Sequence, residues 1–415
     1  MKRYQIAGVL CLLFSLLLCA CSAPPESVVS ELKQAAAEIS LTPVTPFLGA
    51  DNATASKSGF YRLTPNPQKG SNIVYIDYAT KAAVYLCSRP ECRHNDETCP
   101  SWFPFAVGGL FLDAKNEHLF CVGSANSEQE QTEVIWKMDV NGENREKFYT
   151  CSPSENLTDM VVSDGSSLYF ATGVVDKETW KLKKTLKQVN IESGEAVDLM
   201  TYQDTEWLFG AFDDELLVLF FDGESRRYDA YSLETKTSRT VLTYDMNVLS
   251  RPSGDSIYLM QPLTDSTAEV LKFNIKTGEM VSLCKDAPYF GADTIMIEDI
   301  VDGRIVIRAS DTRENDPEKI KRYHYAVDCE TGEMTDLPLT YPMGETTNFV
   351  QIAADAGEFF VVNSGLERVK AVLNGPDGTP YETEISMSAF SMISKSDYWS
   401  GQPNYIEIDH SAIAG

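Results

Sequence analysis

Three cysteines and one histidine fall within thirteen residues of the chain, in the pattern C-x4-C-x-H-x4-C. They are Cys87, Cys92, His94 and Cys99. Tetrahedral zinc accepts three thiolates and one imidazole, so the four side chains are a candidate structural zinc site wrapped by a single loop. The spacing differs from that of the common zinc ribbons and fingers.

Two other interpretations of these residues stay open. A disulfide, Cys92–Cys99 or Cys87–Cys99, would close the same loop if the protein lies outside the reducing cytosol. More simply, Cys87 ends a predicted strand, because Cys284 has the same position in a later repeat. Cys121 lies in the middle of another predicted strand, and we expect it in the core.

Two groups of acidic residues are candidates for catalysis. Asp213-Asp214-Glu215 and Glu298-Asp299 could supply the carboxylate pair that glycoside hydrolysis requires. The simpler interpretation places the first group in a turn and the second on the edge of an inner strand. The sequence contains no G-x-S-x-G, G-x-x-x-x-G-K-[ST] or H-E-x-x-H motif, so a non-catalytic role is favoured over a hydrolase.

The N-terminus predicts export and a lipid anchor. Lys2-Arg3 precedes an apolar stretch over 7–18 that ends in Leu18-Cys19-Ala20-Cys21. This resembles the lipobox of bacterial lipoproteins, which implies a signal peptide over 1–20 and an acylated (for example palmitoylated) Cys21 at the extracytoplasmic face of the cell membrane. An ordinary secretory signal or a membrane-spanning anchor are the alternatives. Residues 21–58 read as a tether, because 40–58 are rich in Thr, Pro, Ala and Ser.

From residue 59 onward, short predicted strands alternate with turns. In the stretch 273–284, Lys276-Thr277-Gly278 joins two strands, and Gly278 tolerates the positive φ that such a turn needs. The same unit recurs along the chain, and four antiparallel strands per unit predict an all-β propeller over 59–415. A solenoid or stacked β-sandwiches are the alternatives.

The count of strands predicts seven four-stranded blades. Six complete blades occupy 105–386. Three strands precede them, at 60–64, 72–76 and 82–86, and one strand follows them, at 388–393. We expect these to pair as a seventh blade that closes the ring with strands from both ends of the chain, which removes the open sheet edges.

In such a propeller the connections between second and third strands share a face with the connections between blades. Aromatic residues in or beside these connections predict a binding face for a glycan or a protein partner: Trp102, Phe103, Trp207, Tyr289, Phe290 and Tyr341. The long loops 124–131, 174–184 and 309–321 lie on the same face. For any single ring, packing at a blade junction is the simpler interpretation.

Net charge excludes one class of partner. The chain carries 35 basic and 61 acidic residues, a formal charge of −26, and so repels nucleic acid and anionic lipid headgroups. The remaining hypothesis is a membrane-anchored binding or scaffold propeller, with an extracytoplasmic hydrolase of glycans or peptides as the alternative.

Two motifs carry a resemblance to a known group of proteins. The run Tyr85-Leu86-Cys87 with Pro90, Cys92, His94 and Cys99, and the C-terminal Ile393-Ser394-Lys395-Ser396-Asp397-Tyr398-Trp399 with Pro403-Asn404-Tyr405, resemble surface lipoproteins of Gram-positive bacteria of the gut type. The resemblance covers residue 59 to the end and the lipobox. It implies a TolB-type propeller at the cell surface and implies no catalytic residue, since no activity is established for that group.

Overall fold

The structure is a computed structural model of the chain, which describes residues 40–45, 52–104, 107–127, 130–202, 204–314, 319–344, 346–374 and 379–413. The chain divides into two compact units, Met1–Ser40 and Leu41–Gly415, and the elements below belong to the second. The signal peptide and Cys21 lie outside the described residues. Among the described helices, none has the length and apolar character needed to cross a bilayer.

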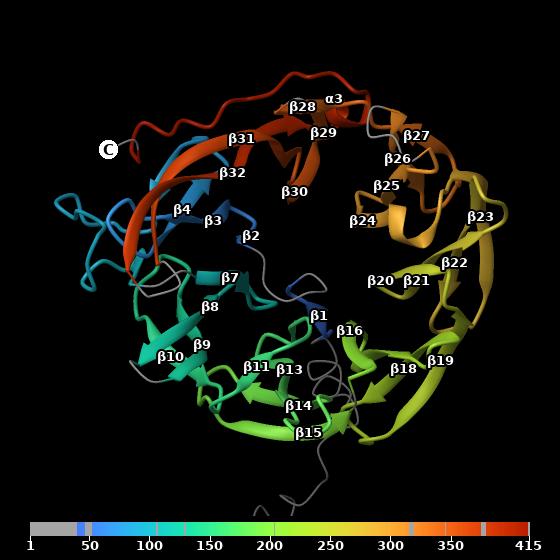
Figure 1. Cartoon of the computed structure of the whole chain (residues 1–415), viewed down its shortest axis with the longest axis horizontal. Helices are drawn as coiled ribbons and strands as arrows, with labels where there is room; N and C mark the ends of the chain where they lie inside the picture. Colours follow the sequence, from blue (N-terminus) through green and yellow to red (C-terminus); the bar gives the residue numbers. More distant parts are fainter. Residues whose placement is uncertain are drawn as a thin grey trace, which may run out of the picture. The chain divides into compact units, whose positions relative to one another are not determined.

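The second unit is a propeller of seven antiparallel sheets arranged around a ring (Figure 1), as the repeat predicts. Blades 1 to 4 lie in chain order. Blade 1 contains β2 (Ala53–Ala55), β3 (Gly59–Pro65), β4 (Ser71–Asp77) and β5 (Ala83–Tyr85), with β6 (Trp102–Phe103) paired to β4. Blade 2 contains β7 (Val107–Leu112), β8 (His118–Ser127), β9 (Glu130–Asp139) and β10 (Glu146–Thr150). Blade 3 contains β12 (Val162–Ser163), β13 (Ser167–Val175), β14 (Leu182–Asn190) and β15 (Ala196–Tyr202), joined by β1 (Thr42–Pro43) and β11 (Glu155–Leu157). Blade 4 contains β16 (Glu206–Phe212), β17 (Glu215–Phe221), β18 (Ser225–Ser232) and β19 (Ser238–Asp245).

Blades 5 to 7 complete the ring. Blade 5 contains β20 (Leu249–Ser253), β21 (Ser256–Pro262), β22 (Thr267–Asn274) and β23 (Met280–Pro288). Blade 6 contains β24 (Ile295–Val301), β25 (Arg304–Asp311), β26 (Lys321–Asp328) and β27 (Met334–Asp336), preceded by the 3-10 turn η1 (Ala292–Thr294). A separate hairpin, β28 (Thr340–Met343) and β29 (Thr346–Phe349), leads to blade 7, which contains β30 (Gln351–Ala356), β31 (Phe359–Asn374) and β32 (Pro380–Ser394) and is followed by α3 (Lys395–Trp399).

Asx-type turns close the outer hairpins, as the sequence repeat predicts. In blade 5 the side chain of Asn274 accepts the backbone N–H groups of Lys276 and Thr277, at 3.0 and 2.9 Å. In blade 6 Asp328 accepts the corresponding N–H groups of Glu330 and Thr331, at 2.9 and 2.8 Å. These bonds satisfy the donors of the turn locally, so the turn type is set by residues within the turn.

Apolar clusters between neighbouring blades form the core, and cations tie some of the blades together. Arg145 of blade 2 donates to the carbonyl of Trp102 at 2.5 Å, and Lys184 of blade 3 donates to the carbonyl of Glu206 at 2.8 Å. Arg251 of blade 5 donates to the carbonyls of Ile297 and Glu298 at 3.1 and 2.7 Å. At these three joints a cation of one blade therefore binds a carbonyl of the neighbouring blade through a charge-assisted hydrogen bond.

The ring closes differently from the prediction. Blade 1 has its own inner strand, β2, and the predicted spare strand at 388–393 is part of β32, which pairs with β31 in blade 7. The two blades meet through side-chain packing of Phe60 against Phe390, with ring centroids 5.0 Å apart, and through the C-terminal segment. In that segment Ile406 pairs with Met392 of blade 7, and Asp409 pairs with Ala82 of blade 1. A split blade is therefore wrong, although the C-terminal segment does join the last blade to the first (Figure 1).

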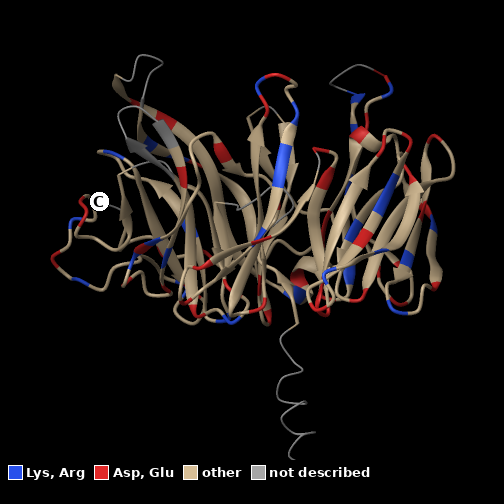
Figure 2. Cartoon of the chain, turned by 90° about the horizontal axis from the view of Figure 1, so that it is seen from below, with Lys and Arg blue, Asp and Glu red and all other residues tan. Residues whose placement is uncertain are grey.

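The propeller also begins earlier than predicted. Strands β1 and β2 lie within 21–58, which composition marked as tether, and each pairs with a strand of the ring. The backbone N–H of Leu41 donates to the carbonyl of Asp213 at 2.9 Å, in the turn between the first two strands of blade 4. The chain thus enters the ring on the face of these first turns. The hairpins that connect second and third strands project from the opposite face, here called the hairpin face (Figure 2).

Candidate metal centre and binding face

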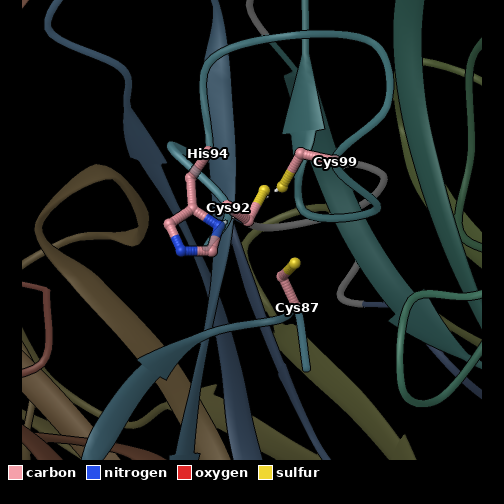
Figure 3. Close-up of side chains that lie close together, drawn as sticks. All are labelled: Cys87, Cys92, His94 and Cys99. Atoms are coloured by element: carbon pink, nitrogen blue, oxygen red, sulfur yellow. Dashed lines mark hydrogen bonds between the residues drawn. The ribbon is translucent and has the colours of Figure 1, made fainter. Parts of the chain in front are cut away.

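The four predicted ligands converge in the structure. One ligand atom each from Cys87, Cys92, His94 and Cys99 lies within 4.8 Å of the others. Figure 3 shows the three sulfur atoms and the imidazole gathered around one small space. They come from the single loop that connects β5 to β6 on the outer side of blade 1, as the spacing predicts.

Buried amides of blade 1 hold this loop in place. The side chains of Asn66 and Asn72 each donate to the backbone carbonyl of His94, both at 2.9 Å. His94 has a φ of 54°, in the left-handed region, and its ring stacks on Tyr85 with centroids 4.4 Å apart. The energetic cost of this backbone conformation indicates that the surrounding contacts fix the position of the imidazole.

The ionisation of the cluster suits a cation. Burial opposes ionisation of Cys87, but hydrogen bonds from the Arg89 N–H and from the neighbouring thiols lower its pKa below the ordinary value. Burial, together with the charge of Arg89, lowers the pKa of His94, so the imidazole is neutral at pH 7. Burial raises the pKa of Cys99 to about 12. A metal ion would displace this proton, because metal ligands bind as thiolates.

The donor set fits a metal better than it fits a disulfide. All seven cysteines among the described residues are free thiols, including Cys87, Cys92 and Cys99. The Nδ1 atom of His94 lies 3.4 Å from the sulfur of Cys99. A disulfide would use two of the sulfurs and leave the third sulfur and the imidazole without a role, whereas a tetrahedral ion uses all four groups. The cluster is therefore a candidate metal centre. Cys121, in contrast, is buried in the core, as predicted.

Most of the predicted aromatic binding face is wrong, because the core takes up these rings. Four of the six side chains are buried: Trp102, Phe103, Tyr289 and Tyr341. Trp102 donates from Nε1 to the carbonyl of Lys69 at 2.9 Å, and Arg145 stacks over Phe103 with 4.6 Å between the guanidinium carbon and the ring centroid. Hydrogen bonds to the indole N–H and cations stacked on the rings hold these side chains inside the blade joints, which leaves no ring face for a ligand.

The other two predicted rings are half-buried and already stacked. Trp207 packs edge-on against Phe221, with centroids 4.9 Å apart, and covers the ammonium group of Lys184 at 4.1 Å. Phe290 stacks on Tyr323 at 5.1 Å, and Arg313 lies 5.0 Å from its centroid. Both rings serve blade joints, as the simpler interpretation expects.

The predicted carboxylate pairs are engaged in structural contacts. Asp213 lies in the turn between β16 and β17 and pairs with Lys276 at 3.1 Å, while Glu215 pairs with Arg239. Glu298 lies at a bulge in β24, where both of its oxygens accept hydrogen bonds, one from Gln351 at 2.7 Å and one from His324 at 3.1 Å. Burial alone would raise the pKa of Glu298, but His324, Arg308 and Gln351 together lower it. A general acid needs a raised pKa, so Glu298 is not prepared for that role.

The structure identifies an exposed aromatic residue that the sequence reasoning did not single out. Trp180, in the loop between β13 and β14, is 82% exposed. It lies within the range 174–184, which was predicted to belong to the hairpin face, so only the individual residue was missed. Val174 and Val175 at the base of the same hairpin are also exposed.

A second acidic group with a histidine was also missed. Asp113, Glu117 and His118 lie close together at the turn between β7 and β8. The carboxylate of Asp113 accepts a hydrogen bond from the backbone N–H of Glu117 at 2.8 Å and another from Nδ1 of His118 at 2.9 Å. These bonds close the turn, so the group is explained as local structure.

Comparison with known proteins adds structural likenesses. No protein-family model and no curated protein matches the chain. Among solved structures, an oligogalacturonate lyase in complex with manganese has a TM-score of 0.46 at 12% identity, covering 84% of this chain and 91% of the lyase. An oligogalacturonate lyase from Vibrio parahaemolyticus has a TM-score of 0.47 at 11% identity over the same shares. TolB from Acinetobacter baumannii has a TM-score of 0.35 at 11% identity, covering 81% of this chain and 79% of TolB. At these values the likenesses carry no information on activity, and the blade assignment rests on the strand pairing of the chain itself.

Proposed function

We propose that the protein is a lipid-anchored propeller that binds a glycan on its hairpin face, outside the cell membrane. The observation that supports this role is the position of Trp180. Its ring is exposed on the face opposite the point where Leu41 enters the ring. Tryptophan is enriched among the residues that dominate binding interfaces, and the exposed Val174 and Val175 of the same hairpin extend its apolar surface.

The hairpin around Trp180 suits a sugar ring. The backbone N–H of Trp180 donates to the carbonyl of Asp176 at 2.8 Å, and Asp176 accepts two further N–H groups through its side chain. These bonds fix the turn, so presenting the indole costs little conformational entropy on binding. An indole offers a flat apolar surface with one N–H donor, which matches the apolar faces and hydroxyls of a sugar.

Membrane attachment rests on the N-terminal sequence. The lipobox ending at Cys21 supports acylation of that thiol, and several acyl chains give stable anchoring. Attachment would place the protein at the extracytoplasmic face of the cell membrane. Replacing Cys21 with Ser should release the full-length protein from the membrane fraction and abolish its labelling with palmitate. Unchanged labelling and sedimentation would exclude Cys21 as the anchor.

Binding is favoured over hydrolysis because of the state of Glu298. This buried carboxylate of the inner strand is held ionised by Arg308 and His324. Such a group supports structure and is poorly suited to proton donation.

The metal centre adds a structural cofactor, for which we propose zinc. Zinc prefers thiolate and imidazole ligands in a closed tetrahedral set, and Cys87, Cys92, His94 and Cys99 supply such a set. When bound, the ion would stabilise the loop by linking its two ends. None of the proposed binding steps passes through it.

A metal measurement tests the zinc proposal. Full-length protein purified without chelator should contain one zinc ion per chain by plasma mass spectrometry, and C99S should contain almost none. C284S is the matched control, because Cys284 is a partly exposed free thiol outside the cluster. A free-thiol count that falls by two in the metal-free protein would instead support a disulfide and would contradict the zinc proposal.

A glycan array tests the binding role. Detergent-solubilised full-length protein should bind a subset of glycans, and W180A should lose that binding. V197A is the control, because Val197 is 51% exposed on the outer strand β15, away from the hairpin face. Equal binding by wild type and W180A would remove Trp180 from the proposed site. Protein-only binding that depends on Trp180 would retain the face and exclude the glycan.

A further inference from the structure

A pocket of about 460 Å³ opens on the hairpin face between blade 6 and the β28–β29 hairpin. Ile320 and Arg322, at the start of β26, form one side, and residues of the β28–β29 hairpin form the other. Thr340, Thr346, Thr347 and Phe349 belong to this second side. Pockets of this size accommodate small ligands, so one or two sugar rings fit it.

The lining is unusual for this chain. The protein has 61 acidic residues, yet none of the described residues that line the pocket is acidic. Arg322 is the single charged residue among them. In a molecule with a formal charge of −26, an anion is attracted only where the local surface is positive. The lining therefore favours a negatively charged ligand.

Arg322 is held in a defined orientation. One of its terminal nitrogens donates to the backbone carbonyl of Thr347 at 2.8 Å. A guanidinium has five N–H donors in a rigid fork, so this bond fixes the plane of the group and leaves other donors for a ligand. Carboxylate and phosphate oxygens match that fork in a bidentate manner.

The remaining lining suits a hydroxylated ligand with an apolar face. Three threonines and Asn348 line the pocket together with Arg322. Phe349 supplies an aromatic wall, and its ring packs against His324 with centroids 4.9 Å apart. His324 in turn donates to the carboxylate of Glu298, so the wall is supported by a polar network behind it.

We propose that this pocket binds an anionic sugar, with the oxyanion on Arg322 and a ring face on Phe349. The shared chemistry is a sugar that carries a carboxylate or a phosphate group. The inference rests on the proposed function only in assigning ligand binding to the hairpin face, since Trp180 does not line the pocket.

Calorimetric titration of the full-length protein with glucuronate, glucose 6-phosphate and glucose tests the proposal. Wild type should bind at least one anionic sugar roughly tenfold more tightly than glucose, as expected for a charged hydrogen-bonded pair. The tighter of the two anions identifies the oxyanion. R322A should lose this preference, and R322K should retain part of it, because lysine keeps the charge and loses the fork.

R368A is the matched control. Arg368 is 81% exposed on β31, outside the pocket, so its removal changes the net charge equally without changing affinity. Absence of anionic-sugar binding by wild type, equal affinity for glucose, or an unchanged affinity of R322A would each overturn the proposal. W180A should keep the affinity of wild type for the anionic sugar. Loss of glycan-array binding in W180A alone therefore concerns the proposed function, and loss of anionic-sugar binding in R322A alone concerns the pocket.

Discussion

Arg62 of blade 1 and Glu367 of blade 7 bring a guanidinium nitrogen within 2.6 Å of a carboxylate oxygen across the closing joint of the ring. The side chain of Arg62 is 4% exposed. A second nitrogen of the same guanidinium donates to the carbonyl of Ser388 at 3.2 Å, and Phe390 lies beside it. The joint between the ends of the chain thus contains a buried cation held by the long β31–β32 hairpin.

We predict that R62A weakens the ring more than the removal of an exposed charge does. Removing one partner of a buried pair leaves groups without compensation and costs about 3 kcal/mol in the free energy of unfolding. R368A is a suitable comparison, because its partner Glu384 lies 3.9 Å away in solvent and such pairs contribute about 0.5 kcal/mol. Urea denaturation of both variants measures the difference. Equal destabilisation by the two substitutions would show that the closing joint does not depend on Arg62.

Gly278 and Gly332 occupy the same turn in blades 5 and 6, and both have a φ of 72°. Their surroundings differ. A Cβ atom at Gly278 would meet nothing within 4 Å, whereas one at Gly332 would lie 1.9 Å from the carbonyl oxygen of Leu283 in the neighbouring blade. Close approach of two blades at Gly332 therefore adds a steric requirement to the conformational one.

From this contrast we predict different costs for two identical substitutions. G278A should cost about 1–2 kcal/mol, the penalty for an L residue in the left-handed region. G332A should cost a further 1–3 kcal/mol or so, because the blade joint must open to admit the methyl group. Thermal unfolding of the two variants compares them directly. A G332A protein as stable as G278A would mean that Leu283 moves away without cost.

These two glycines show what the sequence can predict about the fold. The turn is local, since Asn274 and Asp328 satisfy its donors from within, so a pattern of a few residues is sufficient to recognise it where a blade has a fourth strand. The blade count follows from repeating that pattern. The contact with Leu283 is set by the packing of separate blades and leaves no periodic signal in the sequence. For the same reason the sequence did not predict how the ring closes. There the C-terminal segment pairs with blade 1 through Asp409 and Ala82, in place of the predicted split blade.

The candidate sites also divide into those that local spacing predicts and those that only folding brings together. Cys87 and Cys99 belong to one short loop, so their spacing alone predicted that they meet. Tyr289 and Tyr341 were expected at the surface because they lie in connections, but connections between blades of this propeller fold into the joints and bury their rings. Arg322 joins residues of a distant hairpin only after folding, so no spacing pattern could identify its pocket.

Lys184 and Asp159 form a fully buried pair, at 3.1 Å, where blade 3 meets blade 4. Asp159 also accepts from the hydroxyl of Tyr202 at 2.6 Å and from the backbone of Leu208 at 2.8 Å. Burial lowers the pKa of Lys184, although Asp159 partly opposes this effect. The ammonium group therefore depends on its partner to remain charged inside the protein.

We predict that D159N destabilises the protein by about 3–5 kcal/mol at pH 7, because it leaves a buried ammonium without a carboxylate. Raising the pH towards 10 should reduce this deficit, since Lys184 then loses its proton and needs no counter-charge. K184M/D159N, which removes both charges, should be less destabilised than the two single variants added together. Denaturation curves at pH 7 and pH 9.5 test this expectation, and a D159N deficit that does not change with pH would contradict it.

Glu298 provides a pH-dependent link between blades 6 and 7, because it joins His324 and Arg308 of blade 6 to Gln351 of blade 7. Its pKa in the folded protein lies below the ordinary value: burial raises it, and the three partners lower it by a larger amount. A carboxylate with a depressed pKa stabilises the fold above its unfolded pKa of about 4.3, and this contribution disappears as the pH falls through the folded pKa.

E298Q should therefore lower the melting temperature at pH 7, where the carboxylate is ionised. The difference between wild type and E298Q should begin to shrink as the pH falls below about 4.3, the pKa of an unfolded glutamate, and should continue to shrink towards the lower pKa of Glu298 in the folded protein. Calorimetry over this range measures the difference directly, and comparing the two proteins at each pH cancels the effect of the other carboxylates. E358Q is the control, since Glu358 lies in the turn between β30 and β31 and no ion pair of its side chain is found among the described residues. A gap between wild type and E298Q that stays constant down to pH 3 would show that geometry at this position matters and that the charge of Glu298 does not.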